Sequence, residues 1–164
     1  MTVSGLNVKA HAEALLSVGE SLGFFDSVQG HEPKSAPDNP GVALAVFGMT
    51  LTPLPEESGL TSASVRIEFQ MRCMKNMLSE PQDQIDLDVL AAADGLLNAL
   101  AGGYTLGGIA RNVDVLGQSG EPLRAQAGYV SIGGGQGRGE GSRMFRVMDV
   151  FVPIIVNDCW IYGE

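Results

Sequence analysis

The residues with the clearest chemical potential form a glycine run, Gly133 to Gly141, whose composition first suggests a phosphate-binding loop. Such a loop holds a phosphate with backbone amides, ends in Gly-Lys-Ser or Gly-Lys-Thr, and opens a helix. Here the run leads instead into Ser142, Arg143 and a segment rich in β-branched residues. We therefore expect a mobile hairpin tip rather than a nucleotide site. Its charged members, Arg138 and Glu140, are candidate contacts with a partner protein.

Metal-ligating residue types occur, but their spacing does not favour a metal site. Asp83, Asp86 and Asp88 could ligate a hard cation. The glycine and the later glutamate of a calcium loop are missing, and acidic side chains at a helix start are favoured by the helix dipole alone. His11 and His31 have no cysteine or carboxylate at zinc-ligand spacing. We expect no metal and no cofactor.

Nucleophilic chemistry has equally little support. The segment from Gly117 to Gly120, Gly-Gln-Ser-Gly, is one residue short of the G-x-S-x-G elbow of hydrolases. Cys73 alternates with apolar residues and is expected to be a packed, inert thiol. We therefore predict that the chain is not an enzyme. A small enzyme or ligand-binding domain whose site is assembled in space remains the alternative, because triads need no sequence spacing.

Two aromatic residues complete the list of candidates. Trp160 and Tyr162 lie near the end of the sequence. Large aromatic side chains there either pack against the domain or anchor a partner protein, as aromatic residues often do at interfaces. The sequence leaves both alternatives open.

Length and charge narrow the class of protein. With 164 residues, the chain is expected to be one domain, 1–164, that buries roughly 70% of its unfolded surface and needs no disulfide. A net charge of −9, from 19 acidic and 10 basic residues, disfavours binding to nucleic acid phosphates or to an anionic membrane. No secretory h-region is seen before the two cysteines, so reduced thiols and folding in the cytosol are expected.

The elements that position these residues follow from hydrophobic periodicity. Apolar residues at helical spacing predict a helix over Asn7–Phe24 capped by Asn7, and a second over Glu80–Ala101. The second has a capping-box spacing at Ser79 and Gln82, and it ends at Gly102 or Gly103. Asp26–Gly41, with three prolines, is expected to be a surface loop.

Alternating and β-branched segments predict five strands. Val42–Thr52 is apolar on both faces, so we expect a central strand, ended by Pro53. Thr61–Cys73 alternates strictly and predicts one core face and one polar face, joined to the preceding strand by a hairpin connection. The other three expected strands are Ile109–Leu116, Gln126–Ile132 and Met144–Val156.

The resulting order, α-β-β-α-β-β-β, is not a βαβ alternation. It predicts an α+β fold in which a mainly antiparallel sheet is flanked on one face by two helices.

Five segments in this order carry a family resemblance. They are VRIEFQMRC (Val65–Cys73), IDLDVLAAADGLLNAL (Ile85–Leu100), RNVDVLG (Arg111–Gly117), PLRAQAGYVSI (Pro122–Ile132) and FRVMDVFVPIIVND (Phe145–Asp158). Together with the preceding helix, this pattern resembles the tail terminator proteins of long-tailed bacteriophages, of the lambda type.

The resemblance implies a homo-oligomeric ring, typically of six copies, in the virion at the head–tail junction after assembly in the host cytoplasm. Such a ring caps the tail tube, ends its polymerisation and offers a docking surface to the head-to-tail connector protein. Genomic DNA passes through the lumen without specific binding. The acidic composition suits that role, because an acidic bore repels the phosphate backbone.

If this interpretation holds, the polar face of the Thr61–Cys73 strand is a candidate contact between neighbouring subunits through Arg66, Glu68 and Arg72. Asp26–Gly41 and Gly133–Gly141 are expected to become ordered on meeting the tube or connector. Three alternatives stay open: another head–tail connector or tail-completion subunit, a small enzyme or ligand-binding domain, and a host-encoded regulatory or chaperone-like domain.

Overall fold

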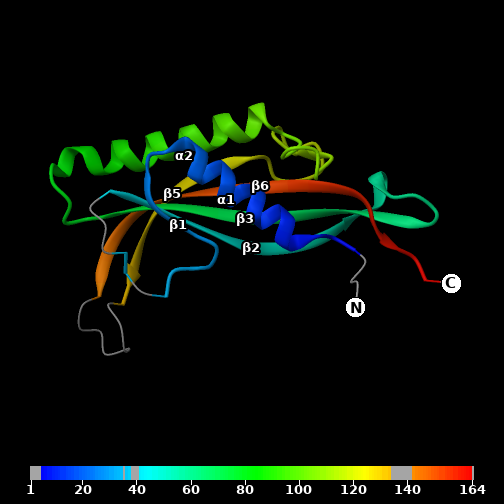
Figure 1. Cartoon of the computed structure of the whole chain (residues 1–164), viewed down its shortest axis with the longest axis horizontal. Coiled ribbons are helices and arrows are strands. Elements are labelled where there is room, and N and C mark those ends of the chain that lie inside the picture. The colour runs from blue at the N-terminus through cyan, green and yellow to red at the C-terminus, as the bar shows by residue number, and fades with distance from the viewer. Residues whose placement is uncertain (1–4, 35, 38–40, 134–141, 164) are drawn as a thin grey trace.

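The computed structural model describes residues 5–34, 36–37, 41–133 and 142–163, which form one six-stranded sheet and two α-helices (Figure 1). In chain order the elements are α1 (Val8–Leu22), β1 (Phe25–Gln29), β2 (Val42–Leu54), β3 (Ser62–Asn76), α2 (Ile85–Gly102), β4 (Asn112–Val113), β5 (Arg124–Ile132) and β6 (Arg143–Ile161). Short 3₁₀ turns over Pro55–Glu57 and Gln82–Gln84 follow β2 and precede α2. The predicted α+β class is confirmed, with β1 as an additional strand.

The sheet is mainly antiparallel, as predicted. Its strands follow the order β1-β2-β3-β6, and β4 and β5 both pair with β6. Only β1 and β2 run parallel; every other pair is antiparallel. The long strands β3 and β6 pair from Asn76 and Phe145 at one end to Ser62 and Ile161 at the other. The C-terminal residues therefore lie beside the β2–β3 connection (Figure 1).

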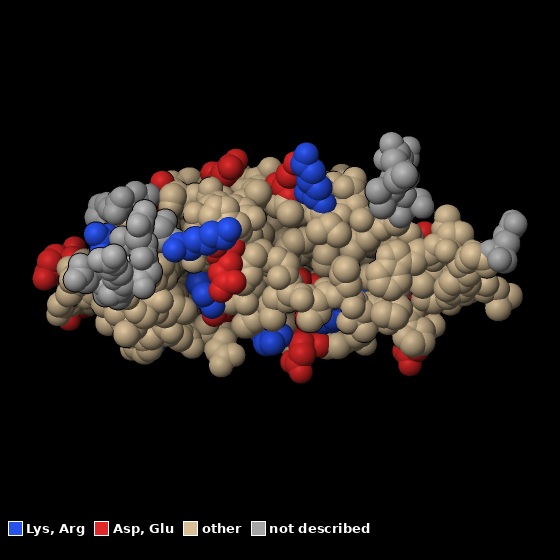
Figure 2. Space-filling view, turned by 90° about the horizontal axis from the view of Figure 1, so that it is seen from below, with Lys and Arg blue, Asp and Glu red and all other residues tan. Residues whose placement is uncertain are grey.

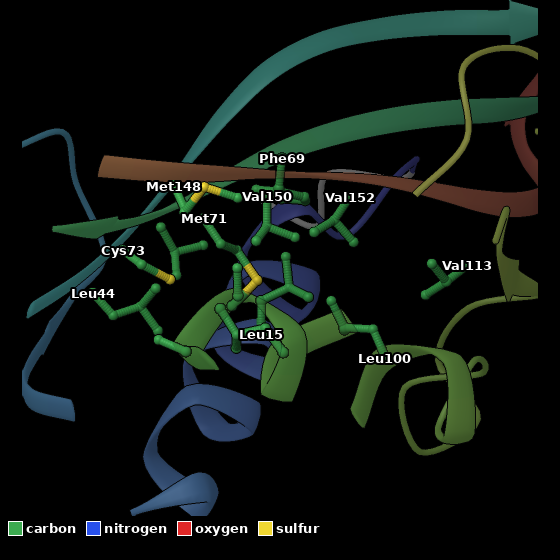
Figure 3. Close-up of a cluster of buried hydrophobic side chains, with 14 of the residues drawn as sticks. Leu15, Leu44, Phe69, Met71, Cys73, Leu100, Val113, Met148, Val150 and Val152 are labelled. Atoms are coloured by element: carbon green, nitrogen blue, oxygen red, sulfur yellow. The ribbon is translucent and has the colours of Figure 1, made fainter. Parts of the chain in front are cut away.

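Both helices cover the same face of the sheet, and the main core lies between them and the central strands (Figure 3). Leu15 of α1 and Leu100 of α2 are fully buried there. From the sheet, β3 contributes Phe69, Met71 and Cys73, which are the residues that strict alternation placed on the core side. The apolar stripes of the helices thus face the apolar rows of the strands.

The opposite face, which we call the open face because no described helix covers it, carries a smaller apolar cluster at one end. Its buried members come from β2, β3, β5 and β6: Ala43, Ala45, Met74, Ile132, Phe145 and Val147. Burial on both faces explains why the first half of β2 reads as a continuous apolar run.

Helix ends agree with the predictions at two of four positions, since α1 ends at Leu22 and not at Phe24. The Asn7 side chain accepts a hydrogen bond from the Ala10 amide at 3.2 Å, and Gly23 ends α1 in the left-handed conformation. Gly103 follows α2. The predicted capping box was wrong in place, because Gln82–Gln84 forms a 3₁₀ turn and the α-helix begins only at Ile85.

Three strand predictions need correction. The expected loop after α1 contains β1, which the Asp26 carboxylate helps to hold by accepting a 2.7 Å hydrogen bond from the Gly41 amide. β2 continues through Pro53 to Leu54, and its second half is exposed rather than buried. Proline is tolerated there because that half lies at the sheet edge, where no ladder hydrogen bond is needed. Of the expected strand Ile109–Leu116, only Asn112–Val113 pairs with β6.

Candidate protein interface

The predicted contact residues of β3 share the open face, but each also has a partner within its own chain. Arg66 is only 6% exposed, and its Nη1 lies 2.5 Å from Oδ2 of Asp114. Its Nη2 donates to the carbonyl of Glu121 and lies 3.6 Å from Oε1 of Glu68. The polar face of this strand is therefore partly covered by the segment that follows β4, and is not a fully solvated face as expected.

Asp114 fixes that covering segment in place. Its carboxylate accepts hydrogen bonds from the amides of Gln118 and Ser119, at 2.8 and 2.9 Å. Burial raises the pKa of the Asp114 carboxyl. The Ser119 amide, the Arg66 guanidinium and the Gln118 amide outweigh that effect and hold the pKa below its usual value. The arrangement has the character of a structural ion pair.

Arg72 and Glu68 are engaged in a similar way. Arg72 makes a bidentate contact with Asp149 across the β3–β6 ladder, at 2.7 and 3.2 Å, and its guanidinium lies over the Phe47 ring. Glu68 accepts a 3.0 Å hydrogen bond from Oγ1 of Thr50. Contact of these residues with a neighbouring subunit stays a prediction. The other two predicted contacts, Arg138 and Glu140, lie outside the described residues.

Trp160 and Tyr162 are brought together at one end of the sheet. They line an apolar hollow of about 560 Å³ with residues from the end of β2, the β2–β3 connection and the start of β3: Pro53, Pro55, Ser58, Gly59 and Ala63. The Tyr162 amide donates to the Thr61 carbonyl at 3.0 Å, which holds the C-terminal residues against β3. Tyr162 is 49% exposed, and the neighbouring Leu60 is almost fully exposed. We call this surface the aromatic hollow.

A second apolar surface, which the sequence analysis missed, lies at the free half of β2. Met49 and Leu51 are about half exposed, and with Val8, Gly48, Thr50 and Ile67 they line a hollow of about 290 Å³. The sequence carries one signal for it, because Pro53 is a residue type that sheets confine to their edges.

A third hollow, of about 320 Å³, separates the start of β2 from α2 and was also not predicted. Phe24, Val42 and Ala92 give it apolar walls, and the ion pair between Lys75 and Asp88 lies at its side. Each charge in that pair has the other as its partner, so the hollow offers no free reactive group among its described lining residues.

The described residues contain no cluster of three or more His, Cys, Asp or Glu side chains that could hold a metal ion. Asp86 pairs with Arg146 at 2.9 Å, and Asp88 with Lys75, which accounts for two of the three carboxylates near the start of α2. His11 is buried, and its Nδ1 lies 2.7 Å from the Asn7 carbonyl oxygen. His31 contacts the Glu32 carbonyl from an exposed position.

The two thiols are poorly suited to nucleophilic chemistry. Cys73 is fully buried, and burial, helped by the negative charge of Asp149, raises its pKa far above the ordinary value. Burial also raises the pKa of Cys159. Neither cysteine forms a disulfide in the structure.

Figure 2 shows the molecule from below, turned by 90° from the view of Figure 1, and shows how the charges are distributed over this face. Basic and acidic side chains lie in small mixed groups, separated by wide uncharged areas (Figure 2). No extended basic patch is seen on this face of the described residues, so it has none of the charge clustering that phosphate binding requires. No described helix is long and apolar enough to cross a membrane.

Comparison with known proteins gives no family assignment. No protein-family model matches the sequence, and no curated protein matches it significantly.

Proposed function

We propose that this chain is a structural subunit of a phage tail, one that caps the tail tube, ends its polymerisation and offers the docking surface for the head-side connector. The observation that carries the proposal is the aromatic hollow, where Trp160 and Tyr162 stand beside two prolines at one end of the sheet. Exposed aromatic side chains beside a concave apolar surface are typical anchors for a partner protein.

Two further features support this function over catalysis. From β3 onward, the elements β3, α2, β4, β5 and β6 follow the order that the resemblance implies. The polar side chains of the open face are paired with each other: Arg66 with Asp114 and Arg72 with Asp149. Paired groups of this kind stabilise a surface and leave few reactive groups directed at a small molecule.

Adding the purified protein to polymerising tail tube subunits tests the proposal directly. We expect tubes to stop growing at the length present when the protein is added, as seen by electron microscopy, and capped tubes to gain the ability to bind heads. Unchanged tube length together with unchanged head attachment contradicts the proposal. A change in head attachment alone favours the alternative of a neighbouring connector or tail-completion subunit.

The docking residues are tested with Tyr162→Ala, since Tyr162 is exposed and its removal leaves the core intact. We expect roughly a tenfold loss of affinity for the tube end or connector, the size typical for truncating an interface anchor. Tyr104→Ala is the matched control, because Tyr104 is 52% exposed and does not line the aromatic hollow. Equal behaviour of the two variants excludes the aromatic hollow as the docking site.

A further inference from the structure

We infer that copies of this chain join through the two edges of their sheets, the free half of β2 in one copy pairing with β5 of the next. This inference names the contact on which the ring of the proposed function depends. It is tested in the absence of tails, so that the two can fail separately.

The first edge is the second half of β2. β1 pairs only with the Val42–Ala45 part of the strand. Beyond it, Gly48–Leu54 pairs with β3 on one side and with no described strand on the other. Its sequence, GMTLTPL, has no charged residue, and all of it except Leu54 is exposed. Proteins protect an exposed edge with charges, prolines or bulges. This edge has Pro53 near its end and a register irregularity between Gly48 and Thr50, but no charged residue along its length, so a partner strand meets no charge there.

The second edge is β5, on the opposite side of the sheet. It pairs with β6 and with no other described strand. From Ala125 to Ile132 it also has no charged residue, and Gln126, Ala127, Tyr129 and Ser131 are exposed. One copy therefore presents two stretches of edge without charged residues, Gly48–Leu54 and Ala125–Ile132, on opposite sides of the sheet. That arrangement gives a head-to-tail contact, which forms a ring when the rotation between copies closes and an open filament when it does not.

The directions of β2 and β5 allow the two edges to form an antiparallel pair. β2, β3, β6 and β5 form an unbroken antiparallel series of four strands, so β2 and β5 run in opposite directions. When the next copy continues the sheet in the same orientation, its β5 lies antiparallel to β2. Antiparallel pairs are slightly more stable per residue than parallel ones.

The two edges are displaced along the strands, and this displacement is compatible with a closed ring of tilted strands. The register runs from Ala43 through Met74 and Val147 to Gly128, so β5 lies level with the part of β2 that β1 already covers. Joining it to the free half of β2 requires each copy to shift along the strand direction. A constant shift of this kind is the stagger that strands have when a sheet closes into a barrel with tilted strands.

Charged substitutions at the two edges test the inference. Leu51→Lys and Ala127→Lys each place a charge on one edge, at an exposed side chain, so the fold is retained; thermal melting verifies this. We expect each to raise the concentration needed for half-maximal assembly by roughly tenfold or more, measured by sedimentation velocity. Leu90→Lys is the matched control, because Leu90 lies on α2 and is 54% exposed against 51% for Leu51. We expect its assembly to match the unmodified chain.

Cysteine cross-linking establishes which edges meet. Copies carrying Leu51→Cys are mixed with copies carrying Ala127→Cys, both in a Cys159→Ser background, and treated with a short thiol cross-linker. We expect dimers in the mixture and none from either variant alone. Efficient cross-linking of Leu51→Cys with itself shows two-fold pairing of β2 and overturns the inference. So does a monomeric unmodified chain at every concentration, or a Leu51→Lys variant that assembles normally. If the edges join copies but tube length never changes, the inference stands and the proposed function fails.

Discussion

At the scale of single residues, the contact between Arg66 and Asp114 holds a long connection onto the sheet. Two charges in a buried environment are stable only when each has a partner and further hydrogen bonds. Asp114 has both, from the guanidinium of Arg66 and from the amides of Gln118 and Ser119. Loss of either charge removes the nearest charged partner of the other. The pair therefore decides whether the segment after β4 stays on β3.

Asp114→Asn is expected to lower the free energy of unfolding at neutral pH by about 1 to 3 kcal/mol, because it leaves the buried Arg66 guanidinium with only the more distant Glu68 as a charged partner. The pKa of Asp114 is lowered in the fold, so its contribution is fully present above the usual carboxyl pKa of about 4. That contribution is lost as the pH falls through the lowered value. Urea unfolding between about pH 6 and about pH 2 measures both effects.

The control for this experiment is Asp94→Asn, since Asp94 is an exposed carboxylate on α2. It should leave stability at pH 7 unchanged and retain the steep acid dependence of the unmodified chain. The Asp114→Asn variant should show a flatter dependence on pH. Parallel pH curves for Asp114→Asn and the unmodified chain contradict the assignment of acid sensitivity to this pair.

The sequence predicts these residues only in part. Alternation along β3 places Arg66, Glu68 and Arg72 on one face, and the structure agrees. Their partners come from distant parts of the chain: Asp114 lies 48 positions from Arg66, and Asp149 lies 77 positions from Arg72. Alternation carries no information about which distant carboxylate reaches a given arginine, so the covering of this face could not be predicted.

At the scale of elements, the approach of α1 to the sheet depends on one small residue. Gly19 is buried, and a Cβ atom at this position would lie 2.4 Å from Cδ2 of Leu44. Leu44 is fully buried on β2 and has little room to move. The glycine lowers the intrinsic stability of the helix, by about 1 kcal/mol relative to alanine. In return it lets the helix lie directly on the strand.

Gly19→Val is expected to destabilise the fold by about 1 to 3 kcal/mol, the usual cost of overpacking a well-packed core. Chemical denaturation measures the change. Ser17→Val is the matched control, because Ser17 lies on the exposed side of the same helix. The substitution introduces the same β-branched side chain without a close contact to the sheet. If both variants lose the same stability, the loss comes from helix propensity alone and the close approach of α1 to β2 has no energetic role.

Elements with their own periodicity were predictable, and elements defined by a neighbour were not. The apolar stripes of the helices and the alternation of β3 are local properties, so α1, α2 and β3 agree with the sequence analysis apart from their ends. β1 is five residues long and is a strand because β2 lies beside it. In the same way, the local sequence of Gly48–Leu54 does not reveal that this half of β2 is an edge of the sheet.

At the scale of the whole molecule, acidity and apolar edges act in opposite directions. A chain with a net charge of −9 repels other copies of itself at low ionic strength. Gly48–Leu54 of β2, Ala125–Ile132 of β5 and the residues that line the aromatic hollow carry no charge, so a contact through them adds nothing to that repulsion. If copies associate through these surfaces, the force that opposes association is the long-range repulsion between their net negative charges.

The dependence of assembly on salt concentration therefore distinguishes a contact between sheet edges from a contact through ion pairs. Raising NaCl from about 0.01 M to about 0.1 M shortens the Debye length from about 30 Å to about 10 Å. If copies meet through the edges of β2 and β5, this screening lowers the repulsion and we expect the concentration for half-maximal assembly to fall, as followed by sedimentation velocity or light scattering. If they meet instead through ion pairs of Arg66, Glu68 and Arg72 with a neighbour, the same salt weakens the contact and that concentration rises. An increase with salt thus contradicts the edge pairing and returns the subunit contact to the polar row of β3.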